Sequence, residues 1–189
     1  MQELILNPTQ LSQWHALISE AQENTASSLD EELESYLIFL LIRFTTKADI
    51  AERFLALDYL ESLQKYGKQR SNKLKDVGDH CLLFSGLFPQ IAKQRRVKIS
   101  YFVDLGRSAY RELSSNSEQH FDLFNELAHR FVLLMDVLQA IRKLDANHPT
   151  LEPLHAYDLW TDTGSQQALN TLSPSTTTLI KPPGNNTQH

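Results

Sequence analysis

The chain lacks the features that mark several classes of protein. Its 189 residues contain one cysteine, Cys81, which excludes an intrachain disulfide framework and favours a reducing compartment such as the cytoplasm. No apolar run reaches the ~20 residues of a membrane-spanning helix, and the most apolar window, 33–44, contains Arg43. The N-terminus has neither the basic region nor the apolar stretch of a secretory signal. We therefore expect a cytoplasmic protein without a membrane segment.

The chain also lacks the short motifs that identify common catalytic chemistry. It has no glycine-rich dinucleotide or phosphate loop, no G-x-S-x-G nucleophile turn, no H-E-x-x-H and no paired C-x-x-C. This absence favours a non-catalytic protein without a cofactor over an enzyme.

Apolar side chains recur every three to four residues along most of the chain, which is the spacing of amphipathic helices. The pattern is clearest over 118–145, and no stretch shows the alternation of a half-buried strand. Ser28 with Glu31 has the form of a capping box at a helix start. We predict an all-α fold in which 1–162 form a single bundle of about six to seven helices. The helices are expected at approximately 8–22, 28–44, 46–64, 71–93, 101–113, 118–145 and 151–160.

Residues 163–189 differ from the rest in composition. They are rich in Ser, Thr, Pro, Gly and Asn and poor in large apolar side chains. Such a segment gains little from burial to offset the entropy that it loses on ordering. We predict a flexible tail that follows the bundle.

The run DVGDHCLLFSGLFP, residues 76–89, places an aspartate, a histidine and the cysteine side by side in an expected helix. Neighbouring helical residues diverge by about 100°, so His80 and Cys81 cannot form a catalytic pair there. Gly78 and Cys81 share one side, and their small size allows a second helix to pack closely, so we interpret the thiol as an inert core group. His80 is expected to hydrogen-bond with Asp76, one turn earlier.

Asp79 lies where the same helix becomes apolar on all sides, so its carboxylate needs a buried partner. Arg43, inside the apolar window, is the expected partner. Arg107 shares a helix face with Asp104, where ion pairs of an exposed surface are expected. The alternative is a buried polar site or ligand site that uses Arg43, Asp79, His80 and Arg107.

Glu126 and His129 have the Glu-x-x-His spacing that places two metal ligands on one helix face in carboxylate-bridged di-iron bundles. Asp122 extends the same face. Such sites need a second helical copy of the motif, which the chain lacks, so the remaining ligands would come from other helices. The alternative function is therefore a di-iron-like or haem-oxygenase-like enzyme or ligand-binding bundle, with iron or another divalent metal as cofactor.

Charge is unevenly distributed along the chain. The formal net charge is −5, yet 65–98 contain nine basic and two acidic residues, whereas 1–64 contain eleven acidic and three basic ones. Two interpretations compete: these cations meet acidic helices of this chain or of a second copy, or they meet an external anion such as nucleic acid or an acidic partner. The acidic overall balance favours protein contacts. The candidate partner-binding residues are Lys68, Arg70, Lys73, Lys75, Arg95, Arg96 and Lys98.

Together these patterns favour a non-catalytic helical protein that acts through protein–protein interaction or regulation. A protein partner is expected, and a second copy of the chain, giving a homodimer, is one candidate. Nucleic-acid binding through residues 65–98 is the third hypothesis, after the metal-containing enzyme.

Overall fold

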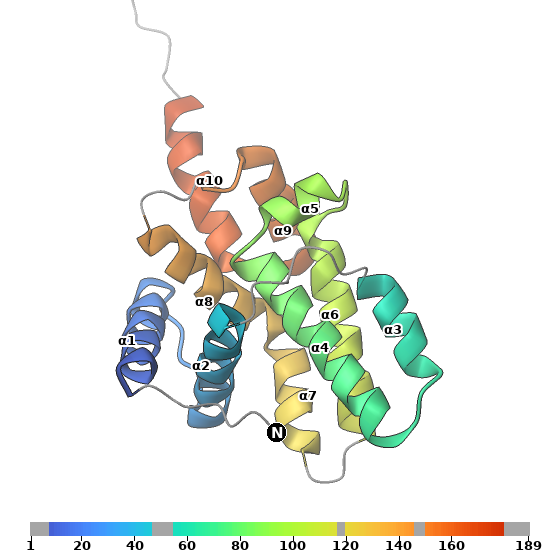
Figure 1. Ribbon diagram of the computed structural model, residues 1–189. Coiled ribbons are helices and arrows are strands. Elements are labelled where there is room, and N and C mark those ends of the chain that lie inside the picture. The colour runs from blue at the N-terminus through green and yellow to red at the C-terminus, as the bar shows by residue number, and fades with distance from the viewer. Residues whose placement is uncertain (1–7, 47–54, 117–119, 146–149, 180–189) are drawn as a thin grey trace, which may run out of the picture.

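The computed structural model describes residues 8–46, 55–116, 120–145 and 150–179, and these residues form helices joined by short connections (Figure 1). They contain ten helices and no strand, so the predicted all-α class is confirmed. The helices are α1 (Pro8–Asn24), α2 (Glu31–Thr46), α3 (Leu55–Leu63), α4 (Gly67–Gly86), α5 (Gln90–Gln94), α6 (Ile99–Ser115), α7 (Phe121–His129), α8 (Phe131–Leu144), α9 (Pro153–Thr163) and α10 (Gln166–Leu179).

The described residues contain more helices than predicted because two expected long helices are each divided and because α10 forms in the segment that was expected to be a tail. The helix expected over 71–93 ends at Gly86, where the main-chain amides of Leu87 and Phe88 both donate to Leu83 O, at 2.8 and 3.0 Å. Pro89 follows, and it has no amide to continue the ladder. The helix expected over 118–145 is interrupted at Arg130, whose backbone leaves helical geometry while the apolar stripe continues from α7 into α8.

The start of α2 shows a cap that differs from the predicted capping box. The main-chain amide of Leu33 donates to Asp30 Oδ1 at 2.9 Å, so the Asp30 carboxylate satisfies one of the free amides of the first turn. Ser28 lies two residues before this cap. Aspartate is as good a capping residue as serine, and sequence spacing alone did not separate the two.

Helix α4 lies at the centre of the bundle and packs against α3, α6 and α8 (Figure 1). The close approach depends on glycine: a Cβ added to Gly78 would lie 2.5 Å from the Tyr110 ring, and one added to Gly86 would lie 2.5 Å from Leu138 Cβ. A Cβ on Gly106, in α6, would lie 2.8 Å from Cys81 Cβ. The small residues of the 76–89 run are therefore the surface on which α6 and α8 pack.

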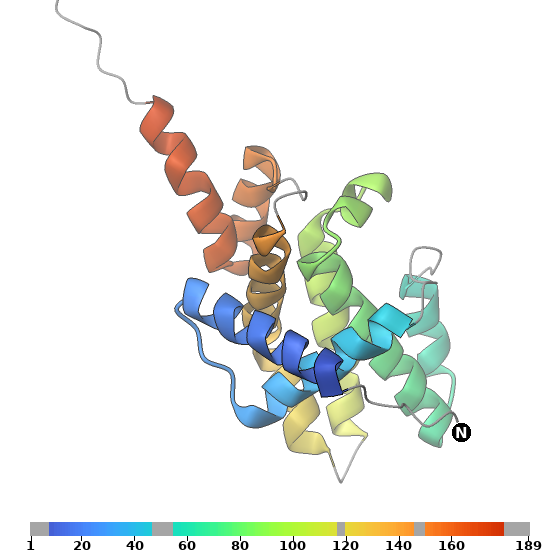
Figure 2. The same cartoon turned by 60° about the vertical axis from the view of Figure 1, so that its left-hand side comes forward.

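Helices α1 and α2 form a pair beside this centre, and α1 also packs against α8 (Figure 2). Leu33, Leu37 and Leu41 of α2 are at most 1% exposed, so the most apolar window of the sequence is a core helix. No helix in the described ranges has both the length and the apolar character that a bilayer span requires.

The C-terminal segment forms a helix where a flexible tail was predicted. Helix α10 pairs with α9 and also contacts α8, and Ala168 is fully buried. Asp136, on α8, accepts hydrogen bonds from Ser165 Oγ at 2.5 Å and from the main-chain amide of Gln166 at 2.9 Å, and it thereby caps α10. Residues 180–189 of the expected tail lie outside the described residues.

Candidate functional site

A buried polar cluster surrounds Asp79, whose side chain is 1% exposed. Its Oδ1 accepts hydrogen bonds from Tyr36 Oη at 2.5 Å and from Tyr110 Oη at 2.7 Å, and its Oδ2 pairs with Arg43 Nη2. Helices α2, α4 and α6 thus meet at one carboxylate. The predicted partnership of Asp79 with Arg43 is present, and the two tyrosines complete it.

The Asp79 cluster has the character of a structural network. Burial and the neighbouring Asp79 charge raise the pKa of Tyr110 and of Tyr36 well above the usual tyrosine value, so both hydroxyls stay protonated as donors. Both carboxylate oxygens have partners. A network that is fully satisfied stabilises and orients its helices, and it leaves no group at Asp79 that is free for acid–base chemistry.

The neighbours of Asp79 in the 76–89 run are also structural. Cys81 is fully buried, and burial raises the pKa of its thiol, so the thiol is neutral rather than a reactive thiolate. His80 Nδ1 lies 2.6 Å from the main-chain oxygen of Asp76, and its ring packs edge-on against Phe84 with centroids 6.1 Å apart. The predicted contact of His80 with Asp76 therefore goes to the backbone.

The Glu-x-x-His pair of α7 does not converge with other ligands. Glu126 pairs with Arg130 at 3.2 Å, and His129 Nδ1 lies 2.9 Å from the main-chain oxygen of Asn125. Asp122 and His129 are exposed. Over the ranges that the structure describes, no group of three or more histidine, cysteine, aspartate or glutamate side chains could hold a metal ion. The geometry therefore gives the metal-enzyme hypothesis no support.

Part of the basic segment pairs with acidic residues of the same chain. Arg70 pairs with Glu112 of α6 at 2.9 Å, and Lys73 pairs with Asp58 of α3 at 3.5 Å and also with Glu61. Further along the chain, the acidic partners lie on and just before α9: Lys93 contacts Glu152 at 2.8 Å, and Lys98 contacts Asp162 at 3.3 Å.

Other cations of the segment pack on aromatic rings or face solvent. Lys75 Nζ lies 5.4 Å from the centroid of the Tyr36 ring, and Arg95 Cζ lies 5.3 Å from the centroid of the Phe84 ring. Lys68 and Arg96 are exposed. The two groups of cations lie at opposite ends of α4, and four of the nine basic residues of 65–98 contact acidic side chains of the described residues.

Arg107 is placed differently from the prediction. Within the described ranges it makes no ion pair with Asp104, whose main-chain oxygen accepts a hydrogen bond from Ser108 Oγ at 2.8 Å. The Nε atom of Arg107 is buried without a hydrogen-bond partner, and Arg107 is not among the residues that line the pocket between α5 and α9.

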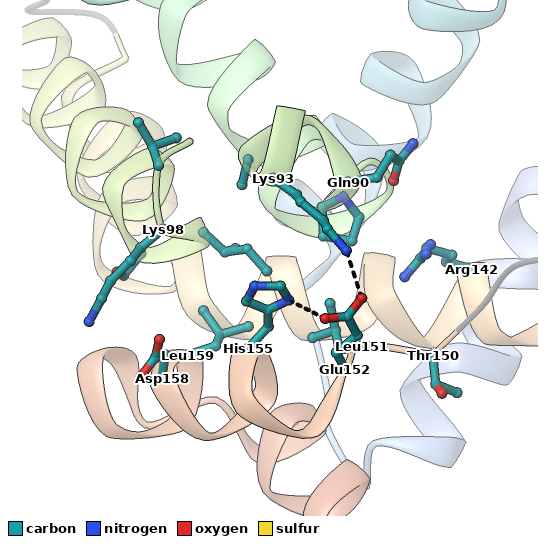
Figure 3. A pocket seen from close by; sticks show the side chains of 15 residues that line it. Gln90, Lys93, Lys98, Arg142, Thr150, Leu151, Glu152, His155, Asp158 and Leu159 are labelled. Atoms are coloured by element: carbon teal, nitrogen blue, oxygen red, sulfur yellow. Dashed lines mark hydrogen bonds and ion pairs between the residues drawn. The ribbon is translucent and has the colours of Figure 1, made fainter. Parts of the chain in front are cut away.

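A pocket of about 240 Å³ opens between α5, the start of α6 and α9 (Figure 3). Glu152 forms an ion pair with Lys93 at 2.8 Å across it, and His155 Nδ1 lies 3.6 Å from the Glu152 carboxylate; Figure 3 draws both contacts. A second link joins α6 to α9, because Ser100 Oγ donates to Asp162 Oδ2 at 2.8 Å. These contacts hold the walls of the pocket together.

Arg142, near the end of α8, is the pocket cation without an acidic partner on the described residues. Its Nε atom is buried and makes no hydrogen bond, and burial lowers the pKa of its guanidinium. By contrast, Lys93 and Lys98 in the same pocket each contact a carboxylate. Sequence analysis missed this site because its residues come from four separate segments and form no local motif.

A second surface feature is the outer face of α3. Leu57 is 57% exposed and Leu60 is 56% exposed, and Leu63 continues the same row one turn further on. The opposite side of α3 buries Leu55 and Ser62 where the helix packs against α4. Helix α3 is therefore apolar on both sides, which packing within the described part of the chain does not explain.

Comparison with known proteins adds no assignment: no protein-family model, curated protein sequence or solved structure matches this chain.

Proposed function

We propose that this protein is a non-catalytic interaction or regulatory protein of the cytoplasm and that the outer face of α3 is its contact surface. The observation that carries the proposal is the row formed by Leu57, Leu60 and Leu63, which is exposed on the described part of the chain. Exposed apolar residues in a continuous row favour protein contact, whereas single ones are ordinary on any surface.

The arrangement of polar groups supports binding over catalysis. Asp79, Tyr36 and Tyr110 are fully engaged with one another and with Arg43. The cysteine is buried, and the acidic side chains nearest the basic segment are engaged in ion pairs. A catalytic site needs a nucleophile or base that can reach substrate, and these groups lack that access.

The partner that we propose for this surface is a second copy of the chain. Leu57 and Leu63 are spaced equally about Leu60. In an antiparallel pair of α3 helices, Leu60 therefore meets its own copy while Leu57 of each copy meets Leu63 of the other, so one two-fold contact covers both rows. The row is only about 9 Å long at 1.5 Å per residue, so we expect a weak, concentration-dependent dimer.

Sedimentation velocity over a wide range of protein concentrations tests this proposal. The unmodified chain should sediment faster as concentration rises, and the double variant Leu57→Ser/Leu60→Ser should remain a monomer. The matched control is Phe39→Ser, which removes an apolar side chain that is 49% exposed on α2 and should not change association. A chain that stays monomeric at every concentration contradicts the proposed dimer, and association that persists in the double variant contradicts the proposed surface.

A further inference from the structure

We propose that the pocket between α5 and α9 binds a small organic carboxylate, with its acid group at Arg142 and its hydrocarbon part against the apolar wall. This proposal does not depend on the α3 surface, because α3 does not line the pocket.

Arg142 would hold the acid group of the ligand. Its side chain lies in the pocket wall, and Figure 3 shows it on the side of the pocket away from Lys98. The buried Nε–H has no acceptor, and the described residues provide no carboxylate for the guanidinium. A guanidinium presents parallel N–H donors that match the two oxygens of a carboxylate, so such a ligand would balance the charge of Arg142.

The pocket lining favours a monoanion over a phosphate. Lys93, Lys98 and Arg142 line the pocket with Glu152 and Asp158, so its lysine, arginine and acidic side chains sum to a single positive charge. A doubly charged phosphate would meet two carboxylates in a small space, whereas one carboxylate balances the lining charge.

The apolar half of the pocket wall determines the size and character of the ligand's hydrocarbon part. It comprises Pro89, Ala92, Val97, Ile99, Leu151 and Leu159. A volume of about 240 Å³ lies below the range of roughly 300–1,000 Å³ that holds drug-sized ligands, so the pocket suits a compact acid with a short hydrocarbon chain. Burial of that chain would add apolar contact to the ion pair.

The test uses hexanoate as the probe and the full-length chain. Titration is followed in two-dimensional NMR spectra that report backbone amides and arginine Nε–H groups. Hexanoate should shift the Nε–H signal of Arg142 and slow its exchange with water, together with amide shifts in α5 and α9. 1-Hexanol, which has the same chain without the acid, and inorganic phosphate should each bind more weakly.

Variants separate the ion pair from the pocket as a whole. Arg142→Gln should weaken hexanoate binding about tenfold or more, because a charged hydrogen-bonded pair is lost. The control Arg111→Gln removes an exposed arginine of α6 that does not line the pocket, and it should leave the affinity unchanged. Val97→Trp fills the pocket from a partly buried position and should abolish binding while Arg142 remains.

Three results would overturn the proposal. The first is a hexanoate titration that leaves the Arg142 signal and the pocket amides unmoved. The second is equal binding of hexanoate and 1-hexanol to the unmodified chain and to Arg142→Gln. Tighter binding of phosphate than of hexanoate at the same residues would reject the organic carboxylate as the ligand class. Val97→Trp leaves the charges in place, so a loss of binding in this variant shows that hexanoate needs the space of the pocket as well as the Arg142 charge.

Discussion

Two arginines in this fold show what a partner does for a guanidinium. Arg43 reaches a buried carboxylate that two tyrosines also contact, so the charges and donors of that cluster are matched. Arg142 lies in a pocket with a buried Nε–H that has no acceptor. The matched group binds three helices together, whereas the unmatched group is available to a ligand. An arginine with a buried partner thus contributes to stability, whereas an arginine without one can contribute to binding.

The largest effect is expected at the matched site. Asp79→Ala removes the acceptor that Tyr36, Tyr110 and Arg43 share, and it takes the carboxylate away from two buried tyrosine hydroxyls. We expect the free energy of unfolding to fall by about 3 kcal/mol, the lower end for breaking a buried pair, because Arg43 is partly exposed. Urea unfolding measures the change. The control Asp104→Ala is on an exposed face and should change stability little, and an equal loss in both variants would refute the comparison.

A steric change beside the same cluster should have the next largest effect. Gly78→Ala places a methyl group 2.5 Å from the Tyr110 ring, which cannot move without losing its contact with Asp79. Overpacking of this kind costs about 1–3 kcal/mol. Thermal unfolding should show a lower midpoint. The control is Ser108→Ala on the outer side of α6, which should leave the midpoint nearly unchanged. Gly164→Ala would not serve, because the backbone φ of Gly164 is +76° and a residue with a Cβ is strained there.

Alkaline pH should weaken the matched site through its tyrosines. Tyr36 and Tyr110 have raised pKa values because they are buried beside Asp79. The folded chain therefore keeps protons that the unfolded chain releases above about pH 10, so stability is fully present below that pH and falls as pH rises. Each tyrosine contributes a slope of up to about 1.4 kcal/mol per pH unit.

Urea unfolding between neutral and strongly alkaline pH measures this slope. The buried Cys81 thiol, whose pKa is also raised, adds a decline that begins above about pH 8.5. Tyr110→Phe should make the slope shallower above pH 10, whereas Tyr66→Phe should not, since Tyr66 is 86% exposed. Identical slopes in the two variants would show that the cluster does not retain its protons.

The smallest effect is expected at the unmatched site. Arg142→Gln removes a guanidinium that gains nothing from an acidic partner, so stability should change by less than about 0.5 kcal/mol in either direction. Urea unfolding of this variant beside Arg43→Gln gives the direct comparison. A larger loss at Arg142 than at Arg43 would mean that the unmatched arginine has a structural role.

Part of this arrangement was predictable from the sequence because it depends on local spacing or on the cost of a buried charge. The all-α class follows from the apolar periodicity, and the pairing of Asp79 with Arg43 follows from their positions in two apolar helices. Tyr36 and Tyr110 were not predicted, because a tyrosine that donates to a carboxylate has the same sequence pattern as any core aromatic residue.

The remaining features depend on residues that are distant in the sequence. Arg142 lies in a helix that was predicted to be longer, and only the tertiary fold brings it to a pocket with Lys93 and Glu152. Composition predicted a flexible tail beyond residue 162, but Asp136 and the apolar surface of α9 order the segment up to Leu179.

The Asp136 cap has a consequence for the order in which the chain folds. Helix α10 depends for its first turn on a carboxylate that belongs to α8, about thirty positions earlier. It therefore gains this stabilisation only after α8 has docked into the core, and we expect its amides to be among the last to become protected from hydrogen exchange during refolding. Asp136→Ala should release the C-terminal helix to protease while the rest of the bundle resists digestion.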